Sequence, residues 1–230
     1  MRLSERLSIM GRNIRLGLRD ASGLAMVEFA MLAPILALVG VSGIELSNYA
    51  ITNLRVSQAA MHIADNGSRI GDRDALNAQK IYEADINDIL LGVDLQAGAE
   101  IELFENARVI ISSLEQNSDG GQWIHWQRCM GELEVDSAYG PEGTGSSGTA
   151  FAGMGKTGQE ITASPNQAVI FVEIIYEYEP LIDLELATRF LSKEYIRTHS
   201  AFNVRGTRDL SGVYPSPGLP VRTCDTYSAS

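Results

Sequence analysis

The sequence predicts an α+β protein: an N-terminal transmembrane helix that extends into a longer helix, followed by a small domain with an antiparallel sheet of about four strands. Three observations predict this class. An apolar run fills residues 24–43, and twenty helical residues rise about 30 Å, the thickness of a bilayer core. Helical spacing of apolar residues continues beyond this run. After Gly98 the pattern changes to the alternation typical of strands.

Charge is distributed unevenly along the chain. The net charge of the 230 residues is −11, yet residues 1–23 hold five arginines and only two acidic residues. Basic residues that flank an apolar segment stay in the cytoplasm. The chain is therefore expected to divide into a basic cytoplasmic leader (1–23), a transmembrane helix (24–46), an exported α+β domain (47–208) and an irregular tail (209–230). An acidic exported domain repels phosphate backbones, so nucleic acid is not expected as a partner.

Three helical segments are expected beyond the apolar run. The first continues to about Asp65 and stops at Asn66-Gly67. Its apolar side chains are interpreted as core packing: Ala50, Ile51, Leu54, Ala59, Ala60, Met61 and Ala64. The second spans 74–91 and ends at Gly92, and a short third spans 181–191.

The strands follow from shorter patterns. They are predicted at 108–115, 122–128, 168–179 and 195–204. Trp123 and Trp126 are expected on opposite faces of their strand, because their separation is odd. The third strand alternates clearly, and its acidic residues are interpreted as a solvated face: Glu173, Glu177 and Glu179.

Residues 140–158 contain seven glycines, which predicts an exposed loop inserted between strands. Two patterns in this region are similar to nucleotide-binding motifs but lack the required context. Gly143-Thr-Gly145-Ser-Ser-Gly148 has no strand before it and no helix after it. Gly155-Lys156-Thr157 is similar to the end of a P-loop, but Ala150 stands where the first glycine is required. No cofactor is predicted.

Cysteine and histidine give little evidence for chemistry. Cys129 and Cys224 are the only cysteines, and on the exported side they are expected to form a disulfide, with two unpaired buried thiols as the alternative. They are too few for a cysteine-based zinc cluster, and His125 with Cys129 supplies only two ligands, so no metal site is predicted. His62 and His199 lie far from His125 in the sequence. No catalytic residue and no small-molecule substrate are predicted.

The junction between the leader and the apolar run contains a charge that needs explanation. Glu28 follows Gly23 by five residues, and an acid inside a bilayer is costly and usually functional. A secretory signal peptide has a shorter, uncharged apolar core, and an ordinary membrane anchor leaves Glu28 unexplained. A glycine directly before an apolar helix whose fifth residue is glutamate resembles a type IV prepilin, in which a cut between Gly23 and Leu24 makes Glu28 the fifth mature residue.

The residues GLAMVEFAMLAPIL from Gly23 to Leu36, followed by Gly43-Ile-Glu-Leu, resemble the N-terminus of TadE/TadG-like pilus-assembly proteins of tight-adherence (Flp-type) machines. Phe29 supplies the aromatic residue after the glutamate. The resemblance implies a pilin-like helix, a location in the bacterial inner membrane with the C-terminal domain in the periplasm, and the function of a minor pilin or pseudopilin. It also implies two kinds of partner: prepilin peptidase, which would cut after Gly23, and other pilus-assembly subunits, which would pair with Glu28.

Two other functions stay open. One is an uncleaved single-pass envelope protein of the same machine that binds other components. The other, less favoured, is a membrane-tethered periplasmic hydrolase, which requires an acid, a base and a nucleophile close together in the folded domain.

Overall fold

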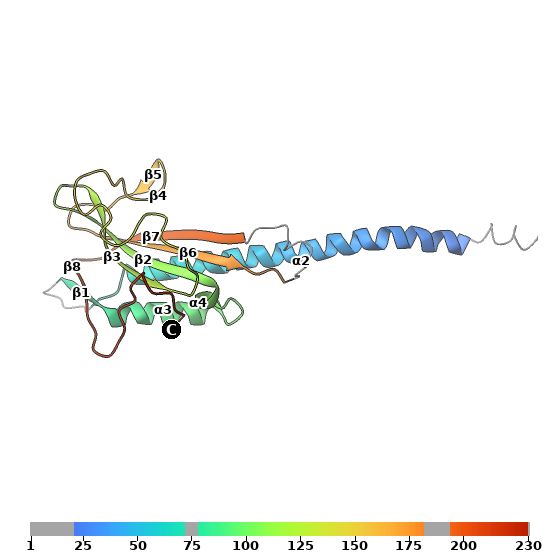
Figure 1. The fold of residues 1–230 in the computed structure, drawn as a ribbon, viewed down its shortest axis with the longest axis horizontal. Helices are drawn as coiled ribbons and strands as arrows, with labels where there is room; N and C mark the ends of the chain where they lie inside the picture. Colours follow the sequence, from blue (N-terminus) through green and yellow to red (C-terminus); the bar gives the residue numbers. More distant parts are fainter. Residues whose placement is uncertain (1–20, 72–77, 182–193, 230) are drawn as a thin grey trace, which may run out of the picture. The chain divides into compact units, whose positions relative to one another are not determined.

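The computed structural model describes residues 21–71, 78–181 and 194–229. The chain divides into two compact units, residues 1–48 and residues 49–230. Helix α2 (Ala21–Gly67) begins in the first unit and ends in the second. Its N-terminal part is long and apolar enough to cross a membrane, which fits a single-pass membrane protein (Figure 1).

Helix α2 ends where the sequence predicts, at Asn66-Gly67. The buried Arg208, far along the chain, donates hydrogen bonds to the carbonyl oxygens of Gly67 and Ile70 at 3.2 and 2.7 Å. A cation at this end of a helix is favourable because the last carbonyls lack partners within the helix. Burial lowers the pKa of Arg208 to about 10, so the guanidinium remains charged at neutral pH.

The packing face of α2 differs from the prediction. Ile51, Leu54 and Met61 were expected in the core but are 51%, 62% and 53% exposed. The buried face consists mainly of small or β-branched residues: Thr52, Val56, Ala59, Ala60, Ile63 and Ala64. Short side chains let a helix backbone approach the sheet closely, so this face packs and the larger side chains point outward.

The second predicted helix begins and ends later than expected. Helix α3 spans Glu83–Ala97, and its first turn is capped by a hydrogen bond from the backbone N–H of Tyr82 to the Asp85 carboxylate at 2.8 Å. Gly92 lies inside the helix, because buried residues on both sides of it, Leu90 and Val93, favour continuation. That burial outweighs the cost of about 1 kcal/mol for an interior glycine. The predicted residues 74–77 lie outside the described range.

The predicted antiparallel sheet of four strands is present, and its strand order is β3-β2-β6-β7. Their bounds are β2 Ala107–Gln116, β3 Gln122–Met130, β6 Val169–Tyr178 and β7 Glu194–Asn203. The one-turn helix α4 (Leu103–Asn106) leads directly into β2. The short helix predicted over 181–191 falls almost wholly on residues 182–193, outside the described range.

Two small sheets complete the second unit. Strand β1 (Gln79–Tyr82) pairs in parallel with β8 (Arg208–Tyr214), and β4 (Met154–Lys156) forms a hairpin with β5 (Gln159–Ile161). Residues 209–214 were expected to be irregular and instead form β8. Their partner, β1, lies more than a hundred residues earlier in the sequence. No local sequence pattern therefore predicts this strand.

Both faces of the main sheet are covered. One face packs on α2, α3 and α4 in the largest hydrophobic cluster, while the other packs on the segment between β3 and β6 and on the tail. Figure 1 shows the β4–β5 hairpin and α3 on opposite sides of the strands. The prediction of a solvated acidic face on β6 is therefore wrong at Glu173, which is only 6% exposed.

A β-bulge changes the faces of the tryptophans. Ser113 pairs with Trp126, but Leu114 pairs with Ile124, so His125 is an extra residue in β3. Glu115 then pairs with Trp123. Directly paired residues point to the same face, and Ser113 and Glu115 are two residues apart on β2, so the two tryptophans share a face instead of lying on opposite faces.

Candidate functional site

The predicted processing and assembly residues lie near the start of α2. The backbone is helical at all four of them: Gly23, Leu24, Glu28 and Phe29. The side chains of Leu24 and Phe29 are 64% and 70% exposed. Within the described residues, the exposed Glu28 carboxylate has no hydrogen-bond or ion-pair partner. A carboxylate on an apolar helix of this length is costly in lipid unless another molecule supplies a donor or a positive charge.

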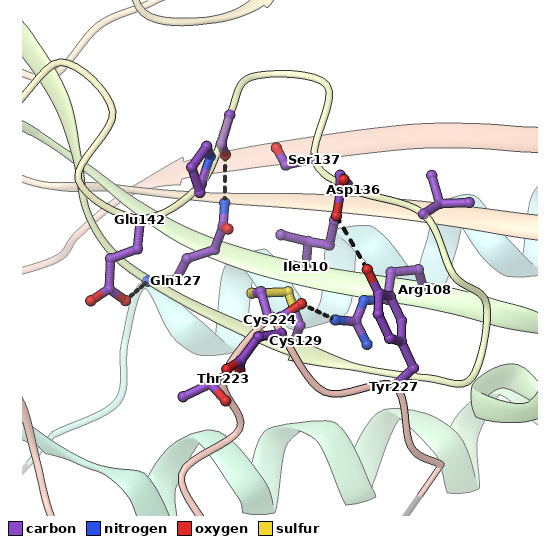
Figure 2. A pocket seen from close by; sticks show the side chains of 14 residues that line it. Arg108, Ile110, Gln127, Cys129, Asp136, Ser137, Glu142, Thr223, Cys224 and Tyr227 are labelled. Atoms are coloured by element: carbon purple, nitrogen blue, oxygen red, sulfur yellow. Dashed lines mark hydrogen bonds between the residues drawn. A yellow bond between two sulfur atoms is a disulfide. The ribbon is translucent and has the colours of Figure 1, made fainter.

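The second unit has its own polar centre, around Arg108 of β2. This arginine is 1% exposed and donates hydrogen bonds to the carbonyl oxygens of Gly131 and Thr226 at 2.9 and 2.8 Å. It also donates to the carbonyl oxygen of Cys224 at 2.7 Å (Figure 2). The ring of Tyr227 lies over the guanidinium, with 4.3 Å between its centroid and Cζ. Burial lowers the pKa of Arg108. Arg108 thus binds the tail to the sheet.

A disulfide joins Cys129 of β3 to Cys224 of the tail, 95 residues apart in sequence. The backbone N–H of Cys129 also donates to the carbonyl oxygen of Arg222 at 2.8 Å. Closing so long a loop removes much of the conformational freedom of the unfolded chain. The disulfide and Arg108 therefore hold the same stretch of tail.

A pocket of about 650 Å³ lies beside this attachment, between the sheet, residues 135–142 and the tail. Its polar side chains bind one another or the backbone: the Tyr227 hydroxyl donates to Asp136 at 3.2 Å, and the backbone N–H of Gln127 donates to Glu142 at 2.8 Å (Figure 2). The disulfide and Ile110 contribute apolar lining. Because these polar groups bond within the chain, we interpret the pocket as part of the attachment of the tail to the sheet.

Glu173 of β6 is the most deeply buried acid on the loop-covered face of the sheet. The Ser137 hydroxyl and the backbone N–H of Ala138 donate hydrogen bonds to its two carboxylate oxygens. Burial nevertheless raises the pKa of Glu173, and the hydrogen bonds only partly oppose this effect. The loop that follows β3 is therefore anchored to the sheet by an acid that the sequence assigned to solvent.

A cluster of serine, acid and histidine was not anticipated from the sequence. Glu115 accepts a hydrogen bond from Ser113 Oγ at one carboxylate oxygen and lies 2.8 Å from His125 Nδ1 at the other. The side chain of His125 is also stacked on Trp123. The bulge brings these groups together, and no sequence signal marks a bulge.

The order of this cluster does not suit acyl transfer. A hydrolytic triad needs the serine bonded to the histidine that takes its proton, with the acid on the far side of the ring. Here the acid lies between the other two, and Ser113 is 1% exposed. His62 lies on α2 and His199 on β7, so neither joins the cluster.

The glycine-rich segment is ordered by side chains from the β2–β3 turn. The amide of Asn117 donates to the carbonyl oxygens of Gly145 and Gly148, and Gly148 N–H donates to Asp119. No helix follows the Gly143–Gly148 pattern, and Gly155-Lys156-Thr157 belongs to the β4–β5 hairpin and its turn. Neither region offers the helix N-terminus that phosphate binding requires.

Metal ligands are likewise not assembled in the described ranges 21–71, 78–181 and 194–229. Within them, no three histidine, cysteine or acidic side chains come close enough together to hold an ion. Cys129, one of the two ligands considered from the sequence, is bonded to Cys224.

Together, these features define a class of protein: one membrane-length helix followed by a compact α+β unit with a disulfide-linked tail. Residues 23–65 match the family model described as "TadE-like protein", which agrees with the resemblance predicted from Gly23, Glu28 and Phe29. The match covers this segment alone, and it supports an association with tight-adherence pilus assembly. No curated protein and no solved structure matches the chain significantly.

Proposed function

We propose that this protein is a minor pilin or pseudopilin of a tight-adherence (Flp-type) pilus assembly and secretion system. The observation that carries the proposal is the match over residues 23–65 to a helix of membrane length. The matched segment contains Gly23 and Glu28, the two residues that the assembly mechanism requires. The second unit then serves as the part of the subunit that faces other components of the machine.

In this mechanism, prepilin peptidase cuts between Gly23 and Leu24 and removes the basic leader. The new amino group and Glu28 lie four residues apart on the same mature helix. Glu28 pairs with the N-terminal amine of a neighbouring subunit, and this pairing fixes the axial register between two helices. Two charges that are costly alone in lipid become a hydrogen-bonded ion pair.

The charge distribution supports one orientation. Five arginines in residues 1–23 favour a cytoplasmic N-terminus in the inner membrane, which places residues 49–229 in the periplasm. That compartment is oxidising, so the Cys129–Cys224 bond would persist there.

An uncleaved single-pass protein of the same machine is the second candidate. The observation that favours it is that α2 begins at Ala21, so the backbone is helical across the Gly23–Leu24 bond. Such a protein would keep its leader and bind other assembly components through its exported unit.

Mass spectrometry of the full chain from the membrane fraction separates the two candidates. The wild type is expected to begin at Leu24, and Gly23→Leu is expected to retain Met1 or Arg2. Gly40→Leu is the matched control, because an added Cβ at either glycine has nothing within 4 Å; this variant should be cut normally. A wild-type chain that begins at Met1 or Arg2 would overturn the cleavage and leave the uncleaved candidate.

A further inference from the structure

The two edge strands of the main sheet, β3 and β7, differ in whether their outward backbone groups are hydrogen-bonded. The outer edge of β3 is occupied by other parts of the chain. Its backbone bonds run to the tail and to the glycine-rich segment: Cys129 N–H to Arg222, Gly131 N–H (just past the strand) to Ser228, Ile124 N–H to Thr144, and Gly143 N–H to Ile124. This edge is closed.

The opposite edge is β7, and its hydrogen-bond pattern can be derived residue by residue. Val204 N–H donates to Ala168 at 2.9 Å, so this pair is a hydrogen-bonded pair of the antiparallel ladder. Such pairs alternate along a ladder, and the β6–β7 register is unbroken over ten pairs. The even-numbered residues therefore bond to β6. The odd-numbered ones turn their N–H and C=O groups outward: Tyr195, Arg197, His199, Ala201 and Asn203.

Within the described part of the chain, these five residues have no further hydrogen-bond partner on the outer side. The edge also lacks two of the features that prevent strand addition: β7 contains no proline, and no bulge interrupts its pairing with β6. A straight strand with free outward groups is a template for another strand.

The exposed side chains on this edge indicate the charge of a partner. Arg197 and His199 are exposed, and within the described residues Arg197 makes no ion pair. On the inner side, His199 pairs with Glu173 of β6. Arg197 pairs with Ile175, and it lies between the pairs His199–Glu173 and Tyr195–Glu177 on the same face. The chain as a whole has a net charge of −11, whereas the charged residue among the five outward ones is the cation Arg197. An acidic strand on the outer side would place acids on both sides of Arg197, those of β6 on one side and those of the added strand on the other.

We infer that β7 accepts an extended, acidic segment of a partner polypeptide as a fifth strand of the sheet. Its backbone would bond to the outward groups of the five odd-numbered residues. An aspartate or glutamate on its exposed face would lie beside Arg197. This inference does not depend on cleavage after Gly23 or on the pairing of Glu28.

The test uses the full chain in the membranes of cells that produce it. A photo-crosslinking amino acid replaces Asn203, which lies at the end of the edge, and the crosslinked peptides are mapped by mass spectrometry. His199→Pro removes an outward N–H and leaves the bonds to β6 intact. His199→Ala is the matched control, which removes the same side chain but keeps the N–H. Thermal unfolding and the oxidation state of Cys129 report whether each variant is folded.

The expected adduct maps to an acidic segment of another protein. Its yield should fall on the order of tenfold in His199→Pro, because a backbone bond is lost and the ring obstructs the added strand, and should stay unchanged in His199→Ala. Arg197→Glu, which keeps the backbone, should reduce the yield about two- to fivefold. If His199→Pro does not fold, the yield of Arg197→Glu decides the question.

Several results would overturn the inference. They are the absence of any adduct, an adduct that maps to a second copy of this chain, and an adduct that maps to a segment without acidic residues. A yield that is unchanged in folded His199→Pro, or unchanged in Arg197→Glu, would do the same.

Discussion

Residues 23–48 and residues 49–229 differ in where their polar and apolar groups find partners. In the second region, buried charged groups are bonded within the chain, as Arg108 is to the tail and Glu173 is to the loop after β3. In the first, large apolar side chains such as Leu36 and Val39 are 66% exposed, and Glu28 has no partner within the described residues. The second region is complete as a folded unit. The first exposes these groups, and contact with lipid would cover its apolar side chains.

This difference separates two kinds of effect. A substitution in residues 23–48 should change insertion, processing or assembly without changing the stability of the folded unit. A substitution in residues 49–229 should change stability first. Each variant below can be measured in two ways: by its insertion and assembly, and by the stability of its folded unit.

Glu28→Ala is expected to have the largest effect. Membrane insertion should be retained or improved, because a charge is removed from the apolar helix, while incorporation into the pilus should be lost. The measurement is the amount of the protein in sheared pilus fractions compared with the amount in membranes. Unchanged incorporation would contradict the pairing mechanism, and a lowered melting temperature of the second unit would contradict the separation of the two regions.

Cys129→Ser with Cys224→Ser should destabilise the second unit strongly. A loop of 95 residues gives an expected loss of roughly 4.7 kcal/mol in the chain-entropy model. Denaturant unfolding of the detergent-solubilised full chain measures this loss, and wild type under reducing conditions is the control. The double variant should still enter the membrane, since the apolar helix is unchanged. A loss below about 1 kcal/mol would mean that Arg108 alone is enough to hold the tail.

Glu173 predicts a dependence of stability on pH. Because burial raises its pKa in the folded state, the folded chain keeps a proton that the unfolded chain has already released. Stability should therefore decrease as pH rises from the usual carboxyl range through the raised pKa, by at most about 1.4 kcal/mol per pH unit. Glu173→Gln does not titrate and should lack this decrease. Equal slopes for wild type and variant in denaturant unfolding would show that Glu173 is not the cause.

The sequence predicted the elements whose signals are local. Three features were predicted to within a few residues: the end of α2 at Asn66-Gly67, the β2–β3 hairpin with its turn, and the end of β6 before Pro180. The segment that carries the family resemblance was also readable, because a glycine, an acid and an apolar run at fixed spacing are contiguous. Its match to residues 23–65 bears out the family resemblance.

The features that were missed depend on contacts between distant residues. β1 and β8 are strands only because they pair with each other across more than a hundred residues. Glu173 was placed in solvent because alternation reveals two faces of a strand but not that a loop covers the second one. The bulge at His125, which brings Glu115 to that ring, leaves no mark in the residue pattern.

The smallest expected effect concerns the packing face of α2, where the sequence was misleading. Large apolar residues at helical spacing suggested a core face, yet Leu54 is 62% exposed while Ala60 is fully buried. Leu54→Gln should therefore change the free energy of unfolding by less than about 0.5 kcal/mol. Ala60→Leu, on the same helix, should cost about 1–3 kcal/mol, because the added volume has no space against the sheet. Denaturant unfolding measures both, and the reverse order would mean that α2 packs through its large side chains.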